Sequence, residues 1–307
     1  MKIGVVLVTF NRLAELKKTI RLYEQQTLKP QYILVVDNHS NDGTADFLAE
    51  WAVEESAVEH KVLTLPENTG GSGGFHAGMA EAADLDADWI WLADDDAYPH
   101  DDVFSVLSVF AEKHSVQMEN IVALCTQNYS GERIAVGHRC RVKKTLLGTF
   151  EVPVSAQEYT KEYFTLDMYS FVGAVVRKDI LQQAGPARKD FFIYADDGEH
   201  GLRMRKYGQI LCVPQAKVFH RDNNDYTREA TWRDYYATRN ILLVSKEYFG
   251  EWAFQMRKIR RLLTALRSGN PEKVKVFRAA IADAKNNVTG LHPVYRPGWQ
   301  PEKKYPK

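Results

Sequence analysis

Short runs of apolar and β-branched residues alternate with helix-like segments from residue 3 to residue 111. The runs 3–9, 32–36, 62–65 and 89–92 have the length and composition of buried strands, because a strand covered on both faces shows a continuous apolar stretch. Apolar residues recur at helical spacing in 13–23, 40–51, 76–83 and 101–111. This alternation predicts an α/β fold whose mostly parallel, doubly wound, Rossmann-like sheet presents ligand sites at the carboxyl ends of its strands.

The pattern becomes less regular after residue 119. It predicts strands over 121–126, 171–176 and 210–213, a hairpin within 139–154, and an amphipathic helix from Trp252 to Leu266. We therefore expect one domain over 1–246 and a helical extension over 247–307.

Composition excludes several classes of protein. Hydrophobic residues make up 45% of the chain and charged residues 26%, as in ordinary globular proteins. Lys plus Arg (40) balances Asp plus Glu (40), whereas a nucleic-acid binder carries a basic excess. Cys125, Cys140 and Cys212 form no CxxC pair, so neither a disulfide framework nor a structural zinc site is predicted. No export signal or membrane-spanning run stands out, and we expect a cytoplasmic protein.

Charge is unevenly distributed along the chain. Residues 251–285 hold nine basic residues against three acidic ones, and four of the cations interleave with the apolar stripe of 252–266. One reading is a helix that lies on an anionic membrane surface. The other is a helix that packs against its own domain or against another subunit, so homo-oligomer formation is left open.

The most specific feature is the triplet Asp94-Asp95-Asp96, which directly follows the apolar run 89–92. Adjacent carboxylates repel one another unless a cation neutralises them, and hard divalent ions prefer oxygen ligands. Asp94 and Asp96 are therefore candidate metal ligands. The alternative is an acidic turn that caps the next helix.

Two further groups can supply chemistry. Asp196, Asp197 and Glu199 follow the apolar segment 191–193; an ionised carboxylate there can accept a proton from a hydroxyl, although a solvated helix N-terminus is an equal alternative. His220 ends the apolar run 216–219, where it either completes a metal site or serves as a structural histidine.

A glycine-rich segment, Asn68-Thr69-Gly70-Gly71-Ser72-Gly73-Gly74, lies between a predicted strand and a predicted helix. Its backbone must either bend sharply or allow a close approach, as a phosphate-binding loop does. It lacks Gly-Lys-Ser/Thr and the dinucleotide fingerprint, which disfavours nicotinamide and flavin enzymes. The alternative is a surface loop.

Taken in order along residues 2–246, these elements resemble family two glycosyltransferases of the GT-A type. The resemblance rests on Val8-Thr9-Phe10-Asn11-Arg12, Val35-Val36-Asp37-Asn38, Asn68-x-Gly70-Gly71, Asp94-Asp95-Asp96, Asp196-Asp197-x-Glu199, His220 and Tyr235-Tyr236-x-x-Arg239-Asn240. It implies a nucleotide-binding half (1–115) and an acceptor-binding half (116–246) of a catalytic domain.

The resemblance also implies roles for individual residues. Asp197 is the expected general base of an inverting transfer. The expected metal ligands for Mn²⁺ or Mg²⁺ are Asp94, Asp96 and His220. The expected donor-binding residues are Thr9, Arg12, Asp37, Asn68, Gly70, Gly71 and Asp95, and the expected acceptor-binding residues are Asp196, Glu199 and Trp232.

The segment Asn68 to Phe75 is similar to that of bacterial galactofuranosyltransferases, which implies UDP-galactofuranose as donor and a polyprenyl-linked glycan of surface polysaccharide (O-antigen, capsule or cell-wall galactan) as acceptor. Such an enzyme works at the inner face of the cytoplasmic membrane. Tyr169-Ser170 and Ala237 depart from chain-polymerising members, which carry paired tryptophans and a histidine there, so acceptor identity and the number of sugars added stay open. Alternatives are transfer from dTDP-rhamnose, UDP-glucose or UDP-galactopyranose, a nucleotidyltransferase, and a sugar-nucleotide sensor.

Overall fold

The computed structural model describes residues 1–146, 148–221 and 229–301. The chain divides into two compact units. The first unit comprises residues 1–141, 151–188 and 197–222, and the second comprises residues 142–150, 189–196 and 223–307. These limits differ from the boundary expected near residue 246, because α8 (Trp232–Val244) packs extensively on α10 (Pro271–Lys285) within the second unit.

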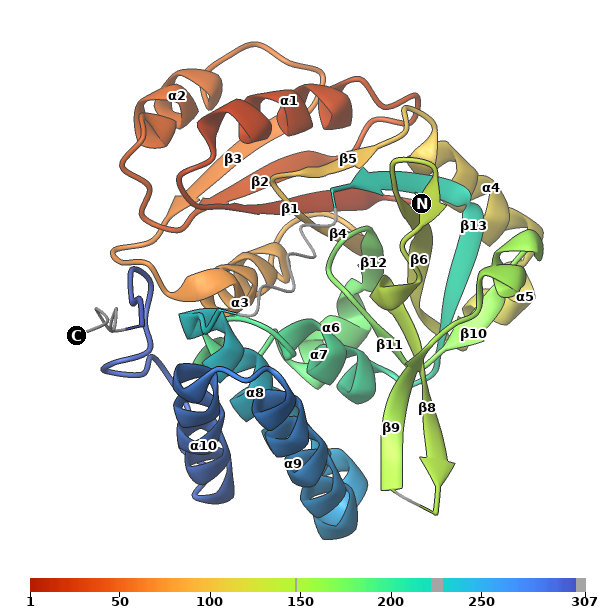
Figure 1. Ribbon diagram of the computed structural model, residues 1–307. Helices are drawn as coiled ribbons and strands as arrows, with labels where there is room; N and C mark the ends of the chain where they lie inside the picture. The colour runs from red at the N-terminus through yellow and green to blue at the C-terminus, as the bar shows by residue number, and fades with distance from the viewer. Residues whose placement is uncertain (147, 222–228, 302–307) are drawn as a thin grey trace. The chain divides into compact units, whose positions relative to one another are not determined.

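The first half of the central sheet is parallel. β1 (Ile3–Thr9) lies between β2 (Tyr32–Asp37) and β4 (Trp89–Asp94), and β3 (Glu59–Thr64) forms the edge beyond β2. Because strand side chains alternate, Val5 and Leu7 of β1 join one buried cluster while Val6 and Val8 join the other. The helices α1 (Leu13–Glu24) and α2 (Thr44–Trp51) cover one face and α3 (Gly70–Ala82) covers the opposite face (Figure 1).

The second half of the sheet is mixed. β12 (Ala174–Arg177) runs antiparallel between β4 and β6 (Ile121–Ser130), and β13 (Gln209–His220) runs parallel to β6. The short strand β5 (Ala97–Pro99) pairs with the end of β13, with Ala97 opposite His220. This pairing places His220, the last residue of β13, beside Ala97, the residue that directly follows Asp96. The backbones that carry Asp96 and His220 are therefore close together.

The remaining elements before residue 205 belong mainly to the first unit, although residues 142–150, in the hairpin described next, belong to the second. β10 (Phe164–Leu166) extends the central sheet beyond β13, β7 (Arg133–Ile134) pairs with β6, and β8 (Arg139–Thr145) forms a small sheet with β9 (Gly148–Pro153) and β11 (Met168–Tyr169). The other helices of the first unit are α4 (Val103–Lys113), α5 (Ser115–Met118), α6 (Lys178–Ala184) and α7 (Asp196–Met204). The 3₁₀ turns are η1 (Val136–His138), η2 (Ala156–Thr160) and η3 (Lys189–Phe191). Of these turns, η3 lies in the second unit.

The second unit is largely helical. A π-helical turn, η4 (Ser245–Phe249), joins α8 to α9 (Gly250–Arg267), and the buried side chains of α8 and α10 share an apolar core. Two tyrosines in the first turns of α8, Tyr235 and Tyr236, are completely buried in it. Across the described residues, none of the helices combines the length and apolar character that spanning a membrane requires.

The fold agrees closely with the expectations from sequence. The α/β class and the mostly parallel, doubly wound half of the sheet are confirmed, as are the 139–154 hairpin and the amphipathic helix that begins near Trp252. The strands expected to end at 126 and 213 continue to 130 and 220. The outer end of β6 carries polar residues, which the apolar pattern cannot identify as strand, and β13 continues past an irregularity between Val213 and Lys217.

Candidate active site

The first unit brings three predicted metal ligands together. Asp94 ends β4, Asp96 lies two residues on, and His220 ends β13. Each offers one ligand atom, and these atoms all lie within 4.8 Å of one another. The Nε2 atom of His220 is 3.3 Å from Oδ1 of Asp96. Residues more than a hundred positions apart thus form one cluster of two carboxylates and an imidazole.

The electrostatics of this cluster favour a cation. Burial, reinforced by the nearby charge of Asp96, raises the pKa of Asp94 to about 6. Burial also acts to raise the pKa of Asp96, but the hydrogen bond to His220 and the charges of His220 and Arg12 outweigh it and hold that pKa below the usual 3.8. A divalent ion would neutralise both carboxylates, and the oxygen and nitrogen donors suit Mn²⁺ or Mg²⁺.

Asp95 points to a different set of partners. The Thr9 hydroxyl donates a 2.7 Å hydrogen bond to Oδ2 of Asp95, and Nη1 of Arg12 lies 3.3 Å from Oδ1. Burial raises the pKa of Asp95 to about 7 despite the opposing charge of Arg12. Thr9 is itself only 1% exposed, so the structure shows it as a support for Asp95, while Arg12 remains partly accessible.

Asp37 has one carboxylate oxygen available for a ligand. Its Oδ1 accepts the Ser40 backbone N–H at 3.0 Å. Its Oδ2 is buried and has no hydrogen-bond partner among the described residues. A buried acceptor without a donor is costly, and a ligand N–H or O–H would relieve that cost.

Asn38, which the prediction of site residues omitted, fixes the glycine-rich segment. Its Oδ1 accepts from the Thr69 backbone N–H, and its Nδ2 donates to the Gly70 carbonyl and to Oδ1 of Asn68. Asn68 Oδ1 in turn accepts the Gly70 N–H at 2.8 Å. The position of Asn38 directly after Asp37, at the end of a buried strand, is the sequence feature that could have identified Asn38.

The glycine-rich segment is mostly helix, not loop. Only Gly70 has a positive φ, +74°, and α3 starts there instead of at residue 76. A Cβ at Gly74 would lie 2.5 Å from Val8, and one at Gly78 would lie 2.5 Å from Val6. These two glycines allow α3 to pack closely against β1. A Cβ at Gly71 would meet nothing within 4 Å, so Gly71 is the glycine that leaves room for a ligand.

Asp197 lies in the first turn of α7. Its Oδ1 accepts the Gly198 N–H at 2.6 Å. Burial raises the pKa of Asp197 to about 6, against the opposing effects of backbone hydrogen bonds and the charge of Arg139. The charge of Asp197 in turn acts on Asp94. A partly accessible carboxylate with this pKa is suited to accept a proton near neutral pH.

The predicted acceptor residues are in different settings. Glu199 is 1% exposed and its carboxylate lies 2.8 Å from Nε of Arg203, so the structure shows it bracing α7. Asp196 is buried and belongs to the second unit, as does Trp232. A contact of any of the three with an acceptor stays a prediction.

Two more residues that the sequence reasoning missed lie in the first unit. Arg139 is completely buried, and its guanidinium donates to the carbonyls of Thr126, Val172 and Gly173. The ring of His138 stands almost perpendicular to that of His220, with centroids 5.3 Å apart. Burial lowers the pKa of His138 to about 3, so a neutral ring packs against the candidate metal ligand. Neither residue belongs to a recognisable motif.

Comparison with known sequences gives consistent relatives. The family described as Glycosyl transferase family 2 matches residues 4–185. Galactofuranosyltransferase GlfT1 of Mycobacterium tuberculosis is 39% identical over 112 residues, which are 36% of this chain and 36% of the relative. The same-named protein of Mycolicibacterium smegmatis is 30% identical over 204 residues, 66% of this chain and 65% of the relative. The matches thus span about a third and just under two thirds of these relatives.

A third relative aligns over more of its length. The uncharacterized glycosyltransferase YwdF of Bacillus subtilis is 33% identical over 228 residues, 72% of this chain and 74% of the relative. Among solved structures, GalNAc-T7 with UDP, GalNAc and Mn²⁺ has a TM-score of 0.66 at 16% identity, covering 94% of this chain and 56% of that one. Mannosyltransferase PcManGT from Pyrobaculum calidifontis, with GDP-Man and Mn²⁺, has a TM-score of 0.56 at 14% identity and covers 93% and 75%. These structures show a shared fold.

Proposed function

Because this chain belongs to glycosyltransferase family 2, we propose that it transfers galactofuranose from UDP-galactofuranose to a hydroxyl of a lipid-linked glycan, with inversion and with a divalent metal ion. The observation that carries the proposal is the convergence of Asp94, Asp96 and His220 on one point. In the sequence His220 lies more than a hundred positions from Asp94 and Asp96, and a purely structural acidic turn would not require a histidine beside it.

Asp94, Asp96 and His220 would hold Mn²⁺ or Mg²⁺. The ion would supply positive charge to the diphosphate and to the negative charge that develops as UDP leaves. The donor set fits this role, since the pKa of Asp94 is raised by burial and by Asp96, and a bound cation would remove that unfavourable interaction.

The nucleotide would lie against the ends of β1 and β2. The unpartnered Oδ2 of Asp37 would accept a hydrogen bond from the base or ribose. Asp95, oriented by Thr9 and Arg12, would meet the ribose or the donor sugar. Asn68, Gly70 and Gly71 would line the approach to the diphosphate, where Gly71 leaves open space.

Asp197 would act as the general base. The acceptor oxygen forms a bond to the anomeric carbon as the bond from that carbon to the diphosphate oxygen breaks. The hydroxyl proton passes to Asp197, and UDP departs with the electron pair. A single displacement of this kind inverts the anomeric carbon. The raised pKa of Asp197 matches a base that must take a proton near neutral pH.

The relatives support galactofuranose as the transferred sugar. The two mycobacterial proteins named galactofuranosyltransferase are 39% and 30% identical to this chain over the aligned parts. The Asn68 to Phe75 segment contributes the same preference from the sequence. A polyprenyl-linked acceptor in surface polysaccharide synthesis follows from the same resemblance.

The exposed face of α9 supports contact with the membrane that would carry such an acceptor. Trp252 is 59% exposed, and Ile259, Leu263 and Leu266 lie on the same face and are also exposed. Arg257, one of the four interleaved cations, is instead buried over the ring of Phe150. Exposed apolar side chains beside Arg260 and Arg267 suit an anionic lipid surface, and we place the protein at the inner face of the cytoplasmic membrane.

Vesicle binding tests the membrane contact. Sedimentation with phosphatidylglycerol vesicles is expected to capture the chain, and the double substitution Trp252→Ala and Leu263→Ser is expected to release it. Val109→Ser is the matched control, since Val109 is 63% exposed on α4. Equal capture of all three proteins would contradict the membrane contact without affecting the proposed chemistry.

A donor screen tests the function itself. The chain is incubated with a synthetic polyprenyl-diphosphate glycan and either UDP-galactofuranose or UDP-galactopyranose, with Mn²⁺ or EDTA, and products are measured by mass spectrometry. Product is expected only with the furanose donor and Mn²⁺, and not with Asp197→Asn. Product from the pyranose alone would refute the donor, and full activity in EDTA would refute the metal.

A further inference from the structure

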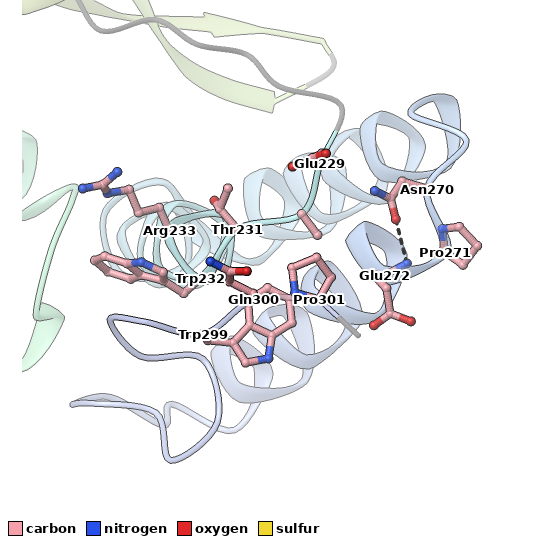
Figure 2. Close-up of a pocket in the computed structure, with 11 residues that line it drawn as sticks. Glu229, Thr231, Trp232, Arg233, Asn270, Pro271, Glu272, Trp299, Gln300 and Pro301 are labelled. Carbon is pink, nitrogen blue, oxygen red and sulfur yellow. Dashed lines mark hydrogen bonds between the residues drawn. The ribbon is translucent and has the colours of Figure 1, made fainter. Parts of the chain in front are cut away.

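The second unit contains a pocket that no residue of the first unit lines. It lies where α8 and α10 begin, with residues 299–301 forming a further wall (Figure 2). Its volume is about 590 Å³, and sites for small molecules typically measure about 300–1,000 Å³. The pocket is therefore large enough for a ligand of one to a few rings.

Two tryptophans give the pocket flat, rigid surfaces. Trp232 and Trp299 are both half-buried and lie in the same part of the pocket, with Gln300 beside them in Figure 2. Tyr236 holds the ring of Trp232 at 81° and 5.9 Å, and Tyr295 holds that of Trp299 at 78° and 5.1 Å. Indoles fixed in this way offer large contact area at low entropic cost. The C–H-rich face of a sugar ring packs well on such surfaces.

The polar lining is mixed in charge. The lining residues include the acidic Glu229 and Glu272, the basic Arg233, whose guanidinium points away from Trp299 and Gln300 in Figure 2, and the amide-bearing Gln300. The Glu272 carboxylate also pairs with Lys275 at 2.7 Å. A pocket for a phosphate would collect cations, and a pocket for an amine would collect anions. Carboxylate, guanidinium and amide groups together instead match the alternating donors and acceptors of a neutral, hydroxyl-rich ligand.

We propose that this pocket binds a neutral saccharide unit of the acceptor glycan, separate from the sugar that receives the transferred residue. The proposal rests on the proposed function, because a glycan acceptor is what brings such a ligand to the protein. It also assigns a partner to Trp232, which the sequence resemblance placed among the acceptor residues, and it adds Trp299.

Fluorine NMR of the full chain tests this directly. The chain has six tryptophans, and incorporation of 5-fluorotryptophan gives each one a resonance that single Trp→Phe variants assign. The probes are methyl glycosides of galactofuranose, galactopyranose, rhamnose and N-acetylglucosamine, as monosaccharides and disaccharides. We expect the resonances of Trp232 and Trp299 to shift in a saturable way with at least one probe, while that of Trp252 stays in place. If no probe moves either pocket resonance, or if Trp252 moves equally, the proposal is overturned.

Substitution provides the second measurement. Loss of one stacked indole is expected to weaken saccharide binding about 10-fold in Trp299→Ala, and Trp299→Phe is expected to retain an intermediate affinity. Trp252→Ala is the matched control, since it removes an exposed indole outside the pocket. Wild-type affinity in Trp299→Ala would also overturn the proposal.

Failure of the pocket and failure of the proposed function are distinguishable. Neither measurement requires turnover, and binding of UDP with Mn²⁺ reports on the first unit alone. Asp197→Asn is expected to lose transfer yet keep saccharide binding. If the chain binds saccharide but does not use UDP-galactofuranose, the pocket proposal is supported and the proposed donor is contradicted.

Discussion

The guanidinium of Arg12 lies 2.8 Å from Oδ2 of Asp96, the same carboxylate whose Oδ1 lies 3.3 Å from His220. Asp96 is therefore the residue through which the end of β1 and the end of β13 meet. Arg12 keeps this carboxylate ionised and oriented, and a metal ion bound by Asp94, Asp96 and His220 would share it with Arg12.

Replacing Asp96 with Asn is expected to weaken Mn²⁺ binding strongly, since even the loss of an outer-shell partner commonly costs about 10- to 100-fold in metal affinity. Isothermal titration with Mn²⁺, with and without UDP, measures the change. Asp86→Asn is the control, because the Asp86 side chain is 85% exposed and pairs only loosely with Lys2. An unaltered titration of the Asp96 variant would contradict the metal site.

Metal-dependent stability is expected to depend on pH. Folding raises the pKa of Asp94 to about 6 and that of Asp95 to about 7, from 3.8. A raised folded pKa contributes stability that is full below 3.8 and is lost as pH rises through 6 to 7. Without metal, these two carboxylates therefore destabilise the protein at pH 8 relative to pH 5.

A bound cation offsets that loss, so saturating Mn²⁺ should raise Tm more at pH 8 than at pH 5. For a domain of about 150–250 residues, each kcal/mol corresponds to about 2–4 °C. Scanning calorimetry at both pH values, with EDTA as reference, measures the two increments. The Asp96→Asn variant should show neither, and equal increments in the wild type would argue against the carboxylate linkage.

Sugar transfer is expected to require the ionised form of Asp197, because only the carboxylate can accept the proton of the acceptor hydroxyl. Activity should therefore rise with pH up to about 6, the value to which burial raises the pKa of Asp197, or somewhat lower once a cation is bound. Asp197→Asn should reduce kcat by about 10²- to 10⁴-fold and leave the affinities for UDP and Mn²⁺ unchanged. The pH profile of kcat at saturating Mn²⁺ provides the check, and substantial activity of the variant would exclude this base.

Asn240 is expected to be a positioning residue for Asp197. Its Nδ2 donates to the carbonyls of Phe191, Ile193 and Tyr194, in a segment where Phe192, Tyr194 and Ala195 all have positive φ. Such conformations cost about 1–3 kcal/mol each and persist only where surrounding contacts fix them. The segment leads directly into α7, which carries Asp197.

Asn240→Leu, which removes these hydrogen bonds at similar volume, should lower kcat while UDP and Mn²⁺ bind normally and the pH limb near 6 stays in place. Steady-state kinetics and UDP titration separate the two effects. The control is Asn286→Leu at an exposed C-cap. A loss of UDP affinity equal to the loss of kcat would indicate general unfolding instead of positioning.

The glycines of α3 are expected to differ in what they do. Gly78→Ala should destabilise the fold by about 1–3 kcal/mol, the usual cost of overpacking, because its Cβ would lie 2.5 Å from Val6 and 2.9 Å from Val36. Gly71→Ala should leave Tm unchanged and weaken UDP-sugar binding. Thermal melts and UDP titration distinguish them, and similar melts for the two variants would contradict the packing argument.

Much of the fold follows from local pattern. The runs at 3–9, 32–36 and 89–92 are buried on both faces, so nearly every residue in them is apolar and the strands are plain in the sequence. The triplet at 94–96 was recognisable because carboxylates rarely follow such a strand without a ligand or a cap. The sequence predicts a loop for residues 70–75, but the structure has a helix there. Glycine is a poor helix former in isolation, and the close packing of Gly74 on Val8 of β1 favours the helix.

The convergence on His220 could not be derived from pattern. It depends on the antiparallel pairing of β5 with the end of β13, a contact between distant segments that leaves no local trace in composition. The grouping of α8 with α10 is hidden for the same reason, because both helices show their apolar residues at spacings that fit several partners. Arg139 acts by hydrogen bonding to backbone carbonyls, which sequence spacing does not report.

The indole N–H of Trp252 donates to the carbonyl of Leu146, in the turn between β8 and β9. A lone amphipathic helix can roll about its long axis on a bilayer and sample many depths. Joined to a hairpin in which Leu146 is 97% exposed, α9 would have two points of contact on the proposed membrane surface and would lose that freedom. The lipid surface would then fix the orientation of the second unit relative to the membrane plane, in addition to concentrating the protein at the membrane.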